Sequence, residues 1–351
     1  MRLALDAMGG DAGPAAVVAG ALHFAAAHPD VSLVLVGEES QLRAALPSRP
    51  PANLQLHHAS QVVGMGEHAL AAVRAKRDAS VRVCFELVRR GEADAAVTAG
   101  HSGAAMAAAL QVLGRLPGVE RPALAALFPA LGTSGRCLLL DVGANAQCRP
   151  SHLAQFAVLG AAYVRACLGV ASPRVAVLSN GEEESKGTPL TRGALALLRQ
   201  SDLDFRGYAE GKDLFSGAFD VLVTDGFTGN AVLKASEGVA AGLTGLLQQA
   251  VHQAHLPSRL GGLLLRPTLA GLGRLVDASE VGGVPLLGIA GVGVIAHGRS
   301  SPRAISSALR VARRTVEADL EGTLASAVAA ARGWLATRAV KGVKGKTPEG
   351  V

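Results

Sequence analysis

Aromatic residues make up only 3% of the 351 residues in this chain. Proteins that bind single-stranded nucleic acid without sequence preference stack the bases on aromatic side chains, so this composition disfavours a nucleic-acid partner. Cysteine is scarce as well, with four residues, no CxxC pair and no histidine at zinc-finger spacing. Reduced thiols in a cytoplasmic protein therefore fit better than a disulfide framework or a metal site.

Long apolar runs and targeting signals are also missing. No stretch reaches the roughly 18 uninterrupted apolar residues that a transmembrane helix needs. The first residues place Arg2 and Asp6 where a signal peptide would be apolar. We therefore expect a first β-strand here rather than a targeting segment.

Two nucleotide-binding signatures are absent. The sequence has no GxxxxGK[ST] loop, and the glycines of residues 291–298 lack GxGxxG spacing. ATP on a P-loop and NAD on a Rossmann fingerprint both lose support.

Charge is unevenly distributed along the chain. The sequence holds 34 basic and 28 acidic residues, a formal net charge of +6. This excess weakly favours acidic partners or substrates. Part of it lies in a basic C-terminal stretch, so we expect one domain over residues 1–335 and a disordered tail over residues 336–351.

Short apolar segments alternate with polar turns and alanine-rich helical stretches, which predicts an α/β fold with a mostly parallel sheet covered on both faces. The expected strands are Leu3–Leu5, Ser32–Val36, Ala95–Thr98, Cys137–Leu140, Val175–Leu178 and Val221–Thr224. The polar turns are residues 6–11, 98–103, 141–145, 180–187 and 225–230. If the strands are parallel, all these turns lie at one edge of the sheet, where α/β proteins bind ligands.

The turn at residues 225–230 is the most informative of these. An apolar run ends at Asp225, and helical spacing resumes beyond Gly226 and Gly229. We expect the two glycines to adopt backbone angles that other residues avoid. The N–H groups of the new helix would suit an anion, with Thr228 and Asn230 beside it.

Three adjacent glutamates, Glu182 to Glu184, precede Lys186 in another of these turns. Adjacent residues point in different directions, which disfavours a shared metal ion, and interaction with a helix N-terminus is the better explanation. Lys186 is either an ordinary surface charge or a cation that orients an anion and neutralises an oxyanion.

The segment Gly100–Ala104 is close to the GxSxG motif but lacks its last glycine. Ser102 with His297 keeps a serine-hydrolase interpretation open. The alternative is that Ser102 and Gly103 begin a helix whose N–H groups hold a phosphate.

Six segments, in order, resemble the PlsX family of bacterial phosphate acyltransferases over residues 1 to about 315. They are Met1–Pro14, Thr98–Met106, Leu138–Pro150, Asn180–Gly187, Asp220–Gly238 and Glu280–Ser300. The resemblance implies a three-layer α/β/α fold like isocitrate dehydrogenase and phosphotransacetylase, without metal or organic cofactor. It also implies transfer of a long-chain acyl group from acyl carrier protein to inorganic phosphate, giving acyl phosphate for phospholipid synthesis.

The same resemblance places the catalytic residues at Lys186 and Asn230. Phosphate is a competent nucleophile and a thiolate is a good leaving group, so alignment and oxyanion stabilisation are the tasks left to the enzyme. We expect the pocket around the substrates to include Gly9, Gly10, Asp11, Ser102, Gly103, Asn145, Asp225, Thr228, His297 and Ser300. The chain departs from the family pattern at His101, Ser102, Gln147 and Arg299, which leaves the phosphate ligands open.

A basic segment offers a docking site for a protein partner. Arg74, Lys76 and Arg77 correspond to a basic helix in the family, and acyl carrier protein is strongly acidic. These side chains either dock the carrier protein or form a solvated helix face.

Residues 240–277 are leucine-rich and interrupted by Pro257 and Pro267, which predicts a protruding helical hairpin. The resemblance implies a homodimer attached peripherally to the inner face of the membrane, near a glycerol-3-phosphate acyltransferase that uses the product. The hairpin would contact membrane, dimer partner or both. Two alternatives remain: a short-chain phosphotransacylase that uses coenzyme A, and a noncatalytic membrane-bound scaffold.

Overall fold

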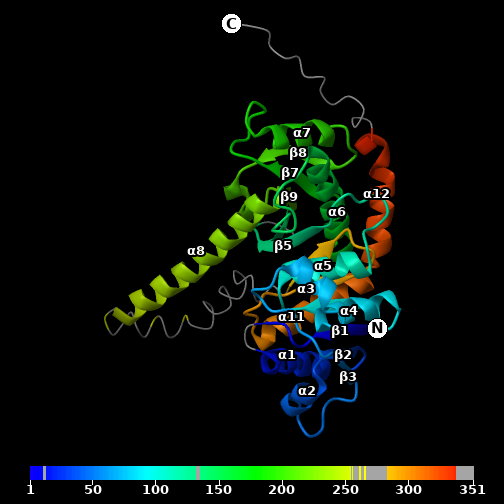
Figure 1. Ribbon diagram of the computed structural model, residues 1–351. Helices are drawn as coiled ribbons and strands as arrows, with labels where there is room; N and C mark the ends of the chain where they lie inside the picture. Colours follow the sequence, from blue (N-terminus) through cyan, green and yellow to red (C-terminus); the bar gives the residue numbers. More distant parts are fainter. Residues whose placement is uncertain are drawn as a thin grey trace.

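A single mixed sheet runs through the molecule in the strand order β3-β2-β1-β4-β11-β10-β5-β6-β9-β7-β8 (Figure 1). The computed structural model describes residues 1–10, 13–131, 135–253 and 283–336, with His255, Gly261 and Leu265. The strands are β1 Arg2–Asp6, β2 Ser32–Gly37, β3 Leu54–His58, β4 Ala95–Thr98, β5 Ala123–Pro129, β6 Arg136–Leu140, β7 Arg174–Leu178, β8 Asp204–Ala209, β9 Val221–Val223, β10 Val284–Leu287 and β11 Gly293–Ile295.

Helices and strands alternate along most of the chain, as the sequence predicts, although β5 is followed directly by β6 and β10 by β11. They are α1 Pro14–Ala27, α2 Glu39–Ala45, α3 Ala69–Ala75, α4 Ser80–Arg89, α5 Ser102–Val112, α6 Pro150–Leu168, α7 Pro189–Leu198, the 3₁₀ helix η1 Gly211–Phe215, α8 Gly226–Gln253, α11 Pro302–Glu317 and α12 Leu320–Ala336. All six expected strands are present, and the predicted α/β class is confirmed. Strands β3, β5, β8, β10 and β11 were not among these six.

Strand direction divides the sheet into two parallel blocks. The first block is β3, β2, β1, β4 and β11, and the second is β6, β9, β7 and β8. Between them, β10 is antiparallel to β11 and β5, and β5 is antiparallel to β6. The two blocks therefore run in opposite directions. The expectation that all five polar turns share one edge is wrong, because two of them leave the first block and three leave the second.

Helices cover both faces of the first block. Helices α1 and α11 pack on one face through Phe24 and Ile305, and α4 and α5 pack on the other through Phe85 and Ala108. In the second block, α6 lies close against the strands, since a Cβ at Gly160 would sit 2.7 Å from Val221 Cγ1. The result is a layered α/β/α arrangement whose core lies on either side of the sheet.

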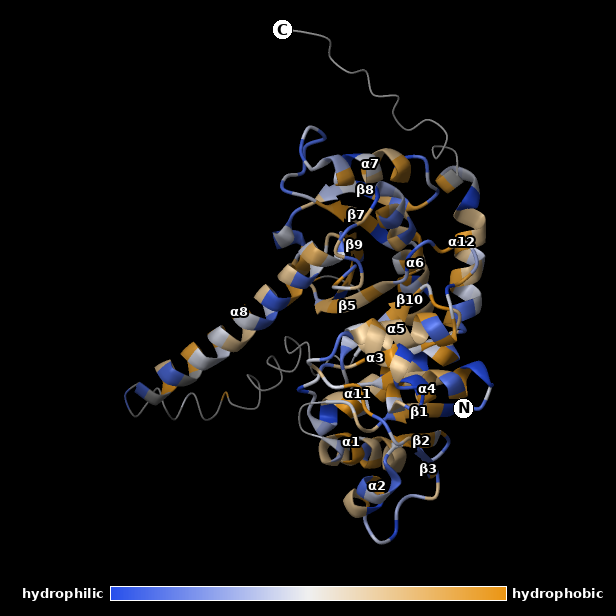
Figure 2. Cartoon of the chain, viewed as in Figure 1, coloured by the Kyte–Doolittle hydropathy of each residue, from blue (hydrophilic) through white to orange (hydrophobic). Residues whose placement is uncertain are grey.

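Helix α8 leaves the second block and projects away from the rest of the molecule (Figure 1). Apolar and polar residues are mixed along it (Figure 2). Four of its large apolar side chains are exposed: Val239, Leu243, Leu246 and Leu247. Its outer part coincides with the start of the hairpin predicted for residues 240–277. Most of the remaining hairpin and the predicted tail beyond Ala336 lie outside the described residues.

Candidate active site

Both expected catalytic residues lie at the carboxyl edge of the second block. Strand β9 pairs with β6 on one side and β7 on the other, with Val223 beside both Leu140 and Val177. The loops after these three strands therefore emerge side by side. Lys186 lies on the loop after β7, and Asn230 lies on α8, which follows β9.

The Lys186 ammonium group is available for a ligand. Its side chain is exposed and has no hydrogen bond or salt bridge to any residue that the structure describes. The aliphatic part of the side chain folds over Gly181, where an added Cβ would lie 2.8 Å from Lys186 Cγ. A cation without an internal partner can bind an anion at no cost of breaking an ion pair.

Ion pairs hold the loop that carries Lys186. Glu182 Oε1 lies 3.3 Å from Lys212 Nζ on η1, and Glu184 pairs with Arg199 just beyond α7. The carboxylates of Glu210 and Glu182 raise the pKa of Lys212. The glutamates were expected to interact with a helix N-terminus, but no acidic residue lies in the first turn of α7.

Asn230 lies in the second turn of α8 with an exposed side chain. Its amide makes no hydrogen bond within the described part of the chain. Its Oδ1 lies 3.9 Å from the position a Cβ would take on Gly143, in the loop after β6. The amide nitrogen is therefore free to donate to an oxyanion beside this loop.

Asp225 and Thr228 fix the start of α8. The Thr228 N–H donates to Asp225 Oδ1 at 2.9 Å, and the Thr228 hydroxyl donates to Asp225 Oδ2 at 2.8 Å. This geometry is that of a helix cap and favours a bracing role for both side chains. Their predicted contact with substrate stays a prediction.

Gly226 and Gly229 are needed for close packing. Neither has a positive φ, so the expected unusual backbone angles are wrong. A Cβ at Gly229 would lie 1.8 Å from the Asp141 carbonyl oxygen, and one at Gly226 would lie 2.8 Å from Asn145 N. Glycine at these two positions lets the first turn of α8 contact the loop after β6.

Asp141 organises that loop, and sequence reasoning did not single it out. Its buried carboxylate accepts hydrogen bonds from the backbone N–H groups of Ala144 (3.0 Å) and Asn145 (2.7 Å), and burial raises its pKa. Asn145 Nδ2 donates to both Asp141 Oδ2 and the Pro122 carbonyl. With its nitrogen occupied, Asn145 is better suited to bracing than to binding phosphate. An acid directly after a buried strand was the available signal.

A second group of loops follows β1, β4 and β11 in the first block. The Thr98 hydroxyl donates to buried Asp6 at 2.7 Å. A Cβ at Gly9 would lie 2.6 Å from Gly100 N, and Gly10 has a φ of 102° beside the Gly298 carbonyl. Glycine therefore allows the three loops to meet. Asp11 lies outside the described residues, and Ser300 is buried here with its N–H donating to His297 O.

The start of α5 is already capped. His101 Nδ1 accepts hydrogen bonds from Gly103 N at 3.0 Å and Ala104 N at 3.3 Å. Two of the N–H groups that were expected to hold a phosphate are therefore occupied in this conformation. Ser102 is exposed at the first position of the helix.

The serine-hydrolase interpretation loses support. His297 Nδ1 accepts a hydrogen bond from Arg299 N, and Nε2 lies 3.1 Å from Lys234 Nζ. No hydrogen bond joins Ser102 to His297 among the described residues.

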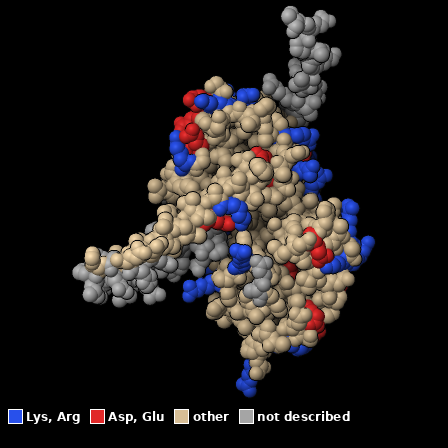
Figure 3. All heavy atoms as spheres, turned by 60° about the vertical axis from the view of Figure 1, so that its left-hand side comes forward, with Lys and Arg blue, Asp and Glu red and all other residues tan. Residues whose placement is uncertain are grey.

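The two groups of loops face a common cleft. Lys234 on α8 reaches His297, which follows β11. A groove of about 870 Å³ is lined by His101 and Gly103 from the first block and by Ala144 and Asn145 from the second. Figure 3 shows basic side chains at the middle of the face from which α8 projects.

In the basic segment predicted to dock a carrier protein, Lys76 is paired within the described part of the protein and the two arginines are not. Lys76 Nζ donates to Glu67 Oε1 at 2.6 Å and to the Val62 carbonyl at 2.8 Å. Arg74 and Arg77 are exposed and have no hydrogen bond or salt bridge to described residues. Of the three cations in this segment, Arg74 and Arg77 are therefore the two that remain available to a partner.

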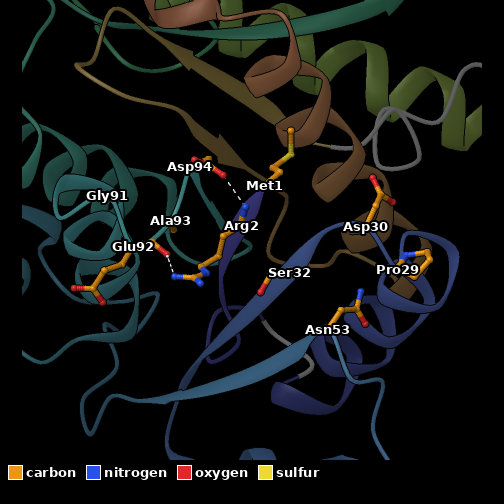
Figure 4. Close-up of a pocket in the computed structure, with 10 residues that line it drawn as sticks. All are labelled: Met1, Arg2, Pro29, Asp30, Ser32, Asn53, Gly91, Glu92, Ala93 and Asp94. Carbon is orange, nitrogen blue, oxygen red and sulfur yellow. Dashed lines mark hydrogen bonds between the residues drawn. The ribbon is translucent and has the colours of Figure 1, made fainter.

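A second cavity of about 500 Å³ lies at the amino ends of β1, β2 and β4 (Figure 4). Arg2 donates there from its backbone N–H to Asp94 and from its guanidinium to the Glu92 carbonyl. None of the predicted site residues lines this cavity. Its lining residues belong to neither group of loops described above.

The described residues contain neither a cluster of metal ligands nor a membrane-spanning helix. Within the described ranges, no group of three or more His, Cys, Asp or Glu side chains is arranged to hold a metal ion. No helix in the same part of the chain has the length and apolarity to cross a bilayer.

Solved structures share the overall architecture at low sequence identity. A phosphotransacetylase from Streptococcus pyogenes superposes with a TM-score of 0.54 at 18% identity, covering 94% of both chains. A branched-chain phosphotransacylase from Enterococcus faecalis gives 0.52 at 16% identity, covering 90% of this chain and 99% of that one. These matches confirm the expected phosphotransacetylase-related fold.

Sequence relatives extend over almost the whole chain. The phosphate acyltransferase of Myxococcus xanthus is 62% identical over 339 residues, which cover 96% of each protein. That of Geobacter sulfurreducens is 47% identical over 327 residues, covering 93% of each. A family model described as "Fatty acid synthesis protein" matches residues 1–322. The chain belongs to the phosphate acyltransferase family.

Proposed function

We propose that the cleft between the two blocks transfers a long-chain fatty acyl group from the thioester of acyl carrier protein to inorganic phosphate. A phosphate oxygen attacks the thioester carbonyl carbon and forms a tetrahedral oxyanion. The C–S bond then breaks, the carrier thiolate leaves and takes up a proton, and acyl phosphate is released. The observation that supports this proposal most directly is a pair of polar side chains without partners among the described residues. Lys186 lies on the loop after β7, and Asn230 lies on α8, which follows the neighbouring strand β9.

The two side chains have complementary tasks. The Lys186 ammonium group binds the phosphate dianion and orients one oxygen for attack. The Asn230 amide donates a hydrogen bond to the oxyanion that develops on the carbonyl. A single donor of this kind contributes about 10²- to 10³-fold to kcat.

Asp141 positions this pair without contacting the reacting atoms. Its carboxylate holds the loop after β6, and the Asp141 carbonyl oxygen lies against Gly229, next to Asn230. The orientation of the Asn230 amide therefore depends on this buried side chain.

Exposed basic and apolar side chains indicate which partners the protein binds. Arg74 and Arg77 attract an acidic carrier protein, which raises the association rate by charge complementarity. The apolar residues of α8 support a homodimer and a peripheral contact with the inner face of the membrane. An acyl phosphate made there is near a membrane glycerol-3-phosphate acyltransferase that consumes it. Residues 1–335 form the catalytic domain in this proposal.

The test compares acyl donors. Purified protein is incubated with phosphate and either palmitoyl-carrier protein or acetyl-coenzyme A, and acyl phosphate is trapped with hydroxylamine. The proposal predicts product from palmitoyl-carrier protein. Product from acetyl-coenzyme A alone would favour a short-chain phosphotransacylase, and no product from either donor would favour a noncatalytic scaffold.

A further inference from the structure

The groove along α5 connects the two groups of loops and is larger than the reacting groups require. Its volume of about 870 Å³ lies within the range of about 300–1,000 Å³ typical of ligand sites. It follows the eleven residues of α5, a length of roughly 16 Å at about 1.5 Å per residue. An extended ligand fits such a shape better than a phosphate ion does.

The walls of the groove combine apolar and charged groups. Leu70, Met106 and Leu110 line it from α3 and α5, and Leu70 is 41% exposed. Arg115, Arg121 and Arg149 line it as well, together with Glu67 and Glu120, which form ion pairs with Lys76 and Arg149. A purely aliphatic chain would leave methylene groups in water here, whereas a ligand with methyl groups, amides and one negative charge would match both kinds of wall.

Arg121 is the uncommitted charge in this set. Arg149 pairs with the Glu120 carboxylate, and Arg115 donates to the Glu120 carbonyl. The exposed Arg121 side chain has no hydrogen bond or salt bridge to any described residue. A guanidinium group in this state is suited to a phosphate group, which it can bind through two hydrogen bonds.

The groove also passes the catalytic edge. Ala144 and Asn145 form part of its wall, and the preceding residue, Gly143, lies beside Asn230. A ligand lying along α5 can therefore present one end to the catalytic amide.

We propose that this groove holds the phosphopantetheine arm of the carrier protein, with the thioester toward Asn230 and the arm's phosphate bound by Arg121. The proposal rests on the proposed function, because the arm carries the acyl group in that reaction. The two amides and the dimethyl group of the arm suit the mixed walls, and its phosphodiester supplies the negative charge.

The experiment separates the arm's phosphate from the rest of the donor. The same acyl group is supplied on pantetheine and on 4′-phosphopantetheine, and kcat/KM for acyl phosphate formation is measured for each. Wild-type protein should prefer the phosphorylated donor by about tenfold, in line with a charge-assisted hydrogen bond at a solvated site. Arg121→Ala should lose this preference while keeping its rate on the pantetheine donor.

Two further variants complete the design. Leu110→Trp should fill the groove and lower kcat/KM for both donors. Arg89→Ala removes an exposed arginine from α4, outside the groove, and should keep the wild-type preference.

The outcomes separate this proposal from the one on which it rests. A preference that persists unchanged in Arg121→Ala overturns the assignment of the arm, and the activity stands. No acyl phosphate from wild-type protein with either donor or with acyl-carrier protein overturns the proposed function, and the assignment of the arm with it.

Discussion

Two exposed side chains, Lys186 and Asn230, are the residues on which the proposed chemistry depends. Lys186 and Asn230 are exposed, and neither forms a hydrogen bond within the described residues through its side chain. We predict that Lys186→Ala and Asn230→Ala each lower kcat by about 10²- to 10³-fold, because each removes charge stabilisation of the transition state. The free energy of unfolding in urea should be unchanged, since substitutions of exposed residues affect stability little.

Lys186→Arg, which keeps the charge, should retain more activity than Lys186→Ala. A variant pair with wild-type kcat would contradict these roles.

Tyr208 is a position where we expect a substitution to keep or raise the stability of the fold. Its hydroxyl is buried below the loop that carries Lys186, near Gly187, and has no hydrogen-bond partner among the described groups. Tyr208→Phe removes a desolvated polar atom and leaves no donor unpaired, so stability should stay equal or rise by about 1 kcal/mol. Thermal or urea unfolding measures this directly. A loss of stability would show that the hydroxyl has a partner in solution.

Asp6 provides a test of pH dependence. Burial raises the pKa of this carboxyl group above its ordinary value of 3.8. The folded protein therefore binds the proton more tightly than the unfolded chain does. The resulting stability is fully present below the unfolded pKa and is lost as pH rises through the folded pKa. The Asp6→Asn variant cannot ionise at this position. The free energy of unfolding of the wild type minus that of the variant should therefore be larger at pH 4 than at pH 7. A constant or reversed difference would contradict this.

At the scale of elements, the Lys186 loop is tethered by exposed ion pairs. Glu182 and Glu184 pair with Lys212 and Arg199. We expect the double variant Glu182→Gln, Glu184→Gln to raise KM for phosphate several-fold with little effect on unfolding, because surface ion pairs contribute little to global stability. The KM of the wild type should rise with ionic strength, and that of the variant should respond less. Equal salt responses would show that the tethers do not position Lys186.

The sequence predicted elements better than it predicted their directions. Apolar periodicity located β1, β2, β4, β6, β7 and β9. The direction of β5 and β10 depends on pairing between segments far apart in the chain, which a short apolar run does not record. The same limit applies to contacts: Gly229 is required by the Asp141 carbonyl, which the local turn pattern does not show.

At the scale of the whole molecule, the two blocks of the sheet run in opposite directions, and yet their loops meet beside α5 and α8. The groove along α5 and the contact between Lys234 and His297 bring both groups of loops to one cleft. The resemblance identified Lys186 and Asn230 as candidates, whereas the bracing by Asp141 and His101 required coordinates. The contacts of Asp141 with Gly229 and Leu124 join segments far apart in the chain, and sequence spacing does not show them.

The exposed apolar residues of α8 give a prediction at this scale. Leu243 and Leu246 are 62% and 64% exposed. If these residues hold the proposed dimer or membrane contact, Leu243→Glu with Leu246→Glu should lower self-association in sedimentation or binding to anionic vesicles. Turnover of soluble acyl-carrier protein should persist. Unchanged association and vesicle binding would contradict a role for this face.

Direct attack of phosphate on the thioester can be tested by a rapid-quench experiment with wild-type protein, palmitoyl-carrier protein and isotopically labelled phosphate. Direct attack by phosphate predicts labelled acyl phosphate and free carrier thiol in equal amounts, with no acylated enzyme by intact-protein mass at any time. An acylated enzyme that forms before phosphate is added, or thiol released without acyl phosphate, would contradict it.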